Sequence, residues 1–103
     1  MLTKNGGEMM SVVVVGGNDR MATMYKDICK SYKCKAKVFT QMPSNLEKQI
    51  GSPDLVVVFT NTCSHKMTKC VDNKADKLSF KVEKIHNASA NALKTVLEQY
   101  CRA

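Results

Sequence analysis

The amino-acid sequence predicts an α/β fold, a single-domain three-layer sandwich in which helices cover both faces of a four-stranded parallel sheet of order 2-1-3-4. Residues 11–17 and 55–61 each run from continuous apolar side chains into small or polar ones. Strands without in-out alternation are typical of parallel sheets covered on both faces, so these two belong in the middle. Residues 35–40 and 78–85 alternate apolar with charged side chains, as strands at the two edges would.

A chain of 103 residues has the length of one domain with its own core. We predict that residues 1–9 form a flexible N-terminal lead and that residues 10–103 form a single α/β domain. Since this domain is too small for a second lobe, a binding site must lie on its one sheet or between subunits.

The first helix of the domain follows the first strand, and Asn18 or Asp19 can cap it. Its apolar side chains recur at helical spacing and are expected to face inward: Met21, Met24, Tyr25, Ile28, Cys29 and Tyr32. After the edge strand 35–40, Pro43 and Ser44 open a short helix that Gly51 ends.

The second half of the chain repeats the strand-helix order. A strand over residues 54–60 leads into a helix that begins near Ser64. A strand over 78–85 then leads into a last helix that begins between residues 87 and 89. The expected inward side chains of these two helices are Met67, Cys70, Val71 and Ala75, and then Ala90, Leu93, Val96, Leu97 and Tyr100.

The composition is basic, with 16 Lys and Arg against 9 Asp and Glu, a net charge of +7. Such a balance suits anionic partners, although a merely solvated basic surface explains it as well. Nucleic acid is compatible with the charge but is not favoured, because aromatic residues make up only 6% and interleave with no basic stretch.

Membrane insertion is not expected, since no apolar run approaches the roughly 18 residues that a span needs. The first residues also lack the hydrophobic region of a signal peptide. Five cysteines without an export signal indicate free thiols, so we predict a cytoplasmic protein.

The predicted strand order reverses its winding between the first and third strands, and ligands of open α/β sheets bind outside the strand ends at such a reversal. We therefore expect a crevice between residues 16–20 and 60–65, bordered by His86 and Asn87. The predicted ligand-binding residues are Gly16, Gly17, Asn18, Arg20, Asn61, Ser64 and His65.

A small anion suits the first side of this crevice. Two glycines allow close backbone approach, the amides at a helix start attract negative charge, and Arg20 adds charged donors. The alternative is that Gly16 and Gly17 serve the turn alone, because the chain has neither G-x-G-x-x-G nor G-x-x-x-x-G-K-[ST]. A nucleotide pocket is less expected, since Thr40 and Gln41 stand where an acidic ribose-binding residue belongs.

The second side carries Cys63 and His65 at a helix start, where the dipole is expected to lower the pKa of the thiol. With His86 as a third ligand, these residues are a candidate site for a transition metal such as zinc, or for thiol redox chemistry. One C-x-H pair falls short of the four ligands of a closed zinc site. The alternative is a capped helix with a small thiol and a polar histidine.

Several segments together resemble the bacterial domain-of-unknown-function family 2325: Ser11–Gly17 with Arg20, Asp54–Thr60 with Ser64 and His65, and Ser89–Lys94. The similarity covers residues 11–97. It implies a small cytoplasmic domain of the Rossmann/flavodoxin-like type and points to Arg20, Ser64 and His65, while the family name implies no settled activity. Cys63 is not part of what this resemblance implies.

These observations favour a non-enzymatic binding or regulatory domain that holds a small anionic ligand at the crevice. A thiol or metal-dependent redox protein that uses Cys63 and His65 is the alternative from another class, and a basic nucleic-acid-binding protein is the third. We also expect a homodimer, because two partly apolar edge strands on so small a domain invite pairing.

Overall fold

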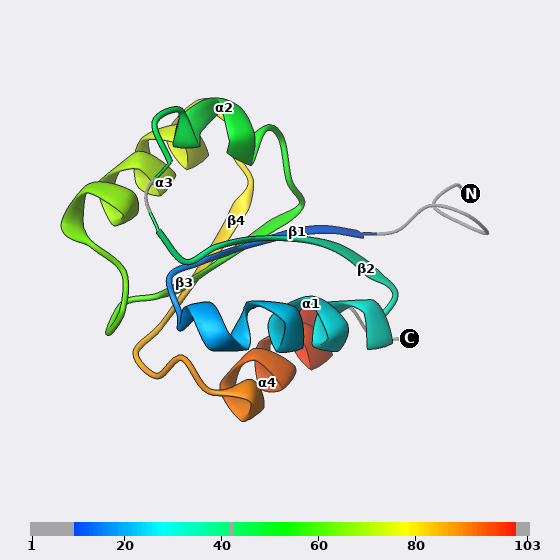
Figure 1. Ribbon diagram of the computed structural model, residues 1–103. Coiled ribbons are helices and arrows are strands. Elements are labelled where there is room, and N and C mark those ends of the chain that lie inside the picture. The colour runs from blue at the N-terminus through cyan, green and yellow to red at the C-terminus, as the bar shows by residue number, and fades with distance from the viewer. Residues whose placement is uncertain (1–9, 42, 101–103) are drawn as a thin grey trace, which may run out of the picture.

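The computed structural model describes residues 10–41 and 43–100 (Figure 1). The elements follow in the order β1 (Met10–Val15), the 3-10 turn η1 (Asp19–Met21), α1 (Ala22–Ser31), β2 (Cys34–Phe39), α2 (Leu46–Ile50), β3 (Leu55–Phe59), α3 (His65–Leu78), β4 (Lys81–Ile85) and α4 (Ala90–Tyr100). The predicted flexible lead, residues 1–9, lies outside the described residues.

The four strands form one sheet of order β2-β1-β3-β4, and every neighbouring pair is parallel. Val14 of β1 is in register with Val38 of β2 and with Val57 of β3. The predicted architecture and strand order are therefore confirmed.

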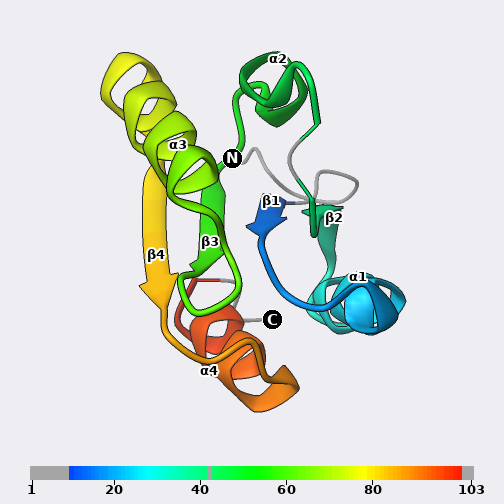
Figure 2. The ribbon, with the colours of Figure 1, turned by 60° about the vertical axis from the view of Figure 1, so that its left-hand side comes forward.

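Helices cover the two faces of the sheet in pairs, α1 with α4 and α2 with α3 (Figures 1 and 2). Each face has its own core, because successive side chains of the central strands point in opposite directions. Val12 and Val14 pack toward α1 and α4, whereas Val13 and Val15 pack toward α2 and α3. This is why the two central strands are apolar at every position.

Local signals place the ends of the third helix. The Ser64 hydroxyl oxygen accepts the amide of Met67 at 3.2 Å, which caps the first turn of α3. At the other end Ser79 adopts a left-handed conformation, with φ of 58°, and its amide donates to the Ala75 carbonyl at 2.7 Å. Such a residue ends a helix, and it separates α3 from β4.

Two sequence expectations are wrong in detail. Leu78 was expected to begin the fourth strand, but it is the last residue of α3 and is 44% exposed, because the left-handed turn at Ser79 follows it. Met24 was expected to face inward, but it is 46% exposed. The regular helix begins only after the 3-10 turn η1, and its inward face is centred on Tyr25, Ile28 and Cys29.

None of the helices within the described ranges has both the length and the apolar character needed to cross a membrane.

Candidate functional site

The loops after β1 and β3 lie at the same edge of the sheet, and the helices that follow them cover opposite faces. Figure 2 shows the chain turning from β1 toward α1 and from β3 toward α3. This is the reversal of winding that the sequence predicts, between adjacent strands. The two loops are therefore the sides of the candidate site, and every residue predicted to bind the ligand lies on one of them or in the helical turn that follows it.

The glycines of the first loop are required by its conformation. Gly16 and Gly17 have φ of 94° and 90°, values that other residues rarely adopt. A Cβ atom on Gly17 would lie 2.6 Å from Cε2 of Tyr25, whose ring is fully buried. These glycines thus serve the turn and the packing of Tyr25.

The amides of both glycines already have acceptors within the protein. The Gly16 amide donates to the Phe39 carbonyl at 2.8 Å, and the Gly17 amide donates to Oγ1 of Thr62 at 2.6 Å. The second bond joins the two sides of the crevice. A ligand that takes the Gly17 amide must therefore displace the Thr62 hydroxyl.

Asn18, Asp19 and Arg20, the next residues of the first loop, are exposed. Some of their polar groups cap the turn, and others have no partner within the described residues. Oδ1 of Asn18 accepts the Arg20 amide at 2.9 Å and so caps η1. Within residues 10–41 and 43–100, no acceptor forms a hydrogen bond with the amides of Asn18 and Asp19. These two amides and the exposed Arg20 side chain are the donors that this loop offers to a ligand.

The carboxylate of Asp19 accepts hydrogen bonds from the chain that follows β2, on the side of β1 away from β3. It accepts the Thr40 hydroxyl and, at 2.9 Å, the Gln41 side-chain amide, and these bonds hold the pKa of the carboxyl below its usual value. Thr40 and Gln41 follow β2, so Asp19 joins the loop after β1 to the chain beyond β2. Its charge is thereby held toward the β2 side of the first loop.

The second side of the crevice is held by main-chain bonds to the end of β4. The amides of Thr60 and Asn61 donate to the carbonyls of Ile85 and His86, at 2.8 and 3.2 Å. His86 therefore lies beside this loop, as expected from the sequence. Asn61, Ser64 and His65 are exposed, and His65 is the first residue of α3.

A comparison with protein families finds a match over residues 11–100 to an uncharacterized protein family conserved in bacteria, DUF2325. The chain belongs to this family. The match spans most of the described domain and both sides of the crevice. It carries no assigned activity.

Other comparisons support the fold alone. A comparison of this DUF2325 domain with curated proteins finds no significant match. Among solved structures, a de novo designed Rossmann fold protein is similar to it, with a TM-score of 0.62 and 12% sequence identity over 92% of this chain and 99% of the design. The Rossmann-like architecture is thus shown, and at this identity the likeness says nothing of ligands.

The pKa of the Cys63 thiol differs from the one expected from the sequence. Its side chain is half-buried against the core under α2 and α3, and this burial raises the pKa of the thiol above its ordinary value. The Thr68 hydroxyl, 3.5 Å from the sulfur, lowers the pKa by a smaller amount. The expected lowering of the pKa at a helix start is therefore wrong, because desolvation of the thiolate outweighs the favourable groups nearby.

The candidate metal ligands do not form a cluster. In the part of the chain that the structure describes, no group of three His, Cys, Asp or Glu side chains is placed to hold a metal ion. Cys63, His65 and His86 are all described and are not such a group. These residues all follow the carboxyl ends of strands, but their side chains do not converge on one point.

Thr62 lies within the predicted crevice range 60–65, but the sequence does not reveal its role. Its hydroxyl oxygen accepts the Gly17 amide across 45 positions of sequence, and no motif or capping pattern marks it. Thr40 and Gln41 were noted only for lacking a carboxylate, yet they hold the Asp19 side chain.

Proposed function

We propose that this domain is a binding or regulatory module that holds a small anionic ligand between the loops after β1 and β3. The observation that carries the proposal is the set of open donors on the first loop, the amides of Asn18 and Asp19 and the exposed Arg20 side chain. They stand before a helix whose positive end faces the crevice. Ser64 and His65 add a hydroxyl and an imidazole from the second loop.

The Thr62 hydroxyl gives this site a way to respond to its ligand. This hydroxyl oxygen accepts the Gly17 amide and so joins the two loops. An anion is a stronger acceptor than a hydroxyl, so it would compete for the same amide. Binding would then exchange a bond between the loops for bonds to the ligand, which is the property of a regulatory module.

A thiol redox function receives no support from the raised pKa of Cys63, since reactive cysteines require a stabilised thiolate. The anion-binding proposal does not use this thiol. Cys63 and Cys70 are free thiols, which fits our proposal of a cytoplasmic location.

Isothermal titration calorimetry with inorganic phosphate, pyrophosphate and adenosine monophosphate tests the proposal. Hydrogen bonds to charged groups contribute about 1.5–3 kcal/mol, so Arg20→Ala should weaken binding by about 10- to 100-fold. Lys81→Ala is the matched control, because it removes one exposed cation at the opposite edge of the sheet. If the wild-type protein is silent toward all three probes, or if both variants lose affinity equally, the proposal is wrong.

A further inference from the structure

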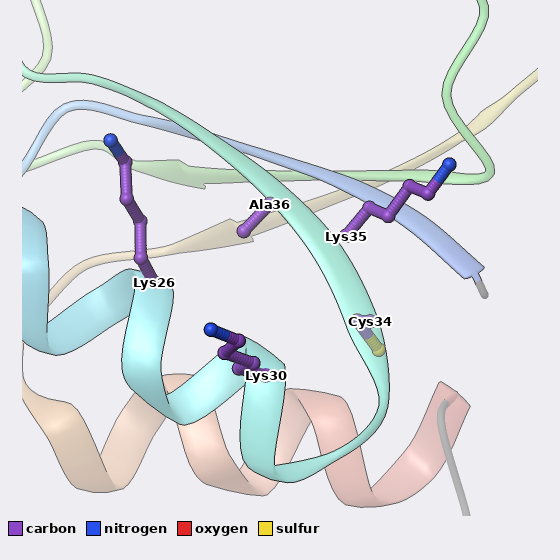
Figure 3. A pocket seen from close by; sticks show the side chains of 5 residues that line it. All are labelled: Lys26, Lys30, Cys34, Lys35 and Ala36. Carbon is purple, nitrogen blue, oxygen red and sulfur yellow. The ribbon is translucent and has the colours of Figure 1, made fainter.

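A basic hollow of about 310 Å³ lies between α1 and β2, away from the crevice. Its lining residues are Lys26, Lys30, Cys34, Lys35 and Ala36. Figure 3 shows Lys26 and Lys30 on successive turns of α1 and Lys35 on the other side of β2 from that helix. The three lysines are exposed, Cys34 is buried, and no acidic residue lines the hollow.

The hollow adjoins an edge of the sheet. Among the described strands β2 pairs with β1 alone, so its second side faces away from the sheet. Edge strands offer main-chain donors and acceptors to a further strand. Cys34, Ala36 and Val38 of β2 face α1 and α4. Lys35 and Lys37 alternate with them and lie on the opposite face, where Phe39 packs toward α2 and α3.

Ammonium groups therefore stand on both faces of this edge. Lys26 and Lys30 come from α1 on one face, and Lys35 and Lys37 from the strand itself on the other. Lys37 is partly engaged, since its Nζ donates to the Gln49 carbonyl at 3.1 Å. Among the described residues, no carboxylate forms an ion pair with Lys26, Lys30 or Lys35.

We propose that the β2 edge binds an extended acidic segment of a partner protein, which adds to the sheet as a fifth strand. Alternate side chains of an added strand point to opposite faces of the sheet. Carboxylates on one face would reach Lys26 and Lys30, and those on the other would reach Lys35. The hollow, floored by Cys34 and Ala36, accommodates the methylene groups of an acidic side chain.

The lysines also determine which strands this edge accepts. Like charges directly opposite each other are destabilising, so pairing of β2 with β2 of a second copy is disfavoured. A neutral strand gains only main-chain bonds while desolvating the lysines, whereas an acidic strand compensates their charge. The same side chains thus exclude the wrong partners and select the right one.

A polypeptide fits this surface better than a nucleic acid. Single-stranded nucleic acids are bound by cationic grooves together with aromatic side chains on which bases stack. No aromatic residue lines the hollow. The position of the cations along an edge strand is explained by main-chain pairing, which a nucleic acid does not provide.

Fluorescence anisotropy tests the proposal with a fluorescein-labelled ten-residue peptide of Glu, Thr and Val. Adjacent pairs of Glu in this peptide place carboxylates on both faces of an extended strand. The double variant Lys26→Gln/Lys30→Gln should bind it about tenfold more weakly, because each exposed pair contributes modestly. The control Lys66→Gln/Lys69→Gln removes the same charge from exposed positions on α3 and should change binding by less than about twofold.

Two further probes separate strand addition from attraction by charge. A peptide in which Pro replaces the Thr and Val residues keeps the Glu pairs but cannot pair along the edge, so it should not bind. A twenty-nucleotide oligo(dT) should bind more weakly than the acidic peptide. Equal binding of the proline peptide, tighter binding of oligo(dT), or equal losses in the two double variants would each overturn the proposal.

Binding of the acidic peptide at the β2 edge can be tested separately from anion binding at the crevice. Arg20→Ala should leave the affinity for the acidic peptide unchanged, since Arg20 does not line the hollow. Matching unfolding temperatures of the variants would establish that a lost affinity does not arise from a lost fold.

Discussion

Replacing Gly17 with alanine tests how closely the first loop is fitted to the core beneath it. An alanine Cβ would lie within 3.0 Å of two atoms of Tyr25, Cε2 at 2.6 Å and the hydroxyl oxygen at 2.9 Å. Tyr25 has no room to move, because its ring packs 5.2 Å from that of Phe59 and its hydroxyl donates to the Ala88 carbonyl at 2.7 Å. The substitution must therefore strain the loop and disturb a fully buried side chain.

The expected cost follows from these two effects. A residue forced to keep φ near 90° costs about 1–3 kcal/mol, and loss of the Tyr25 hydrogen bond adds about 1 kcal/mol. We expect Gly17→Ala to lower the free energy of unfolding by about 2–4 kcal/mol, measured by urea denaturation with far-UV circular dichroism.

A second glycine of the chain supplies the control. Gly51 also has a positive φ, 65°, but a Cβ there would meet no atom within 4 Å. Gly51→Ala should therefore show the cost of a positive φ at a non-glycine residue without a clash of the new Cβ atom. In a Tyr25→Leu background the cost of Gly17→Ala should fall toward that of Gly51→Ala. If Gly17→Ala is no more destabilising than Gly51→Ala in the wild-type background, the reasoning is refuted.

Four further predictions concern other parts of the molecule. Folding lowers the pKa of Asp19, so the stability that this carboxylate contributes is present above the ordinary carboxyl pKa and is lost as the pH falls through the folded value. In urea denaturation below about pH 4, the free energy of unfolding should therefore fall less steeply with pH for Asp19→Asn than for the wild type. The raised pKa of Cys63 predicts slow alkylation by iodoacetamide at neutral pH, slower still in Thr68→Val; mass spectrometry that finds Cys63 modified faster than a peptide thiol would contradict this. Ser79→Gly should stabilise the protein by about 0.5–1 kcal/mol in thermal unfolding, because φ of 58° suits glycine, and a destabilised variant would argue against the left-handed turn. A homodimer should form through the β4 edge, which carries charges of both signs, and light scattering that returns 11.4 kDa at every concentration would contradict it.

The fold was predictable because its main determinant is written in consecutive residues. Val12, Val13, Val14 and Val15 divide between the two cores by simple alternation, and the apolar residues of β3 do the same. A strand buried on both faces has few alternatives in so short a chain. The order of the sheet then follows from placing the alternating strands at its edges.

The chemistry of the site was less predictable because it depends on contacts between distant segments. The Gly17 amide looks available in the sequence, yet Thr62 accepts it from a loop 45 positions away. The helix start at Ser64 suggests an acidic thiol at Cys63, yet packing against the core reverses the shift in pKa. Sequence position locates these residues at one edge of the sheet, but their partners and burial decide what they can do.

The most direct test of the proposed anion site is a titration of the ¹⁵N-labelled protein with pyrophosphate, followed by amide chemical shifts in NMR spectra. We expect the signals of Asn18, Asp19 and Arg20 to shift progressively and saturate. The Gly17 signal should move as its bond to Thr62 is exchanged, and Arg20→Ala should suppress these changes. Unchanged signals from this loop, or shifts confined to residues around Lys26 and Lys30, would contradict this expectation.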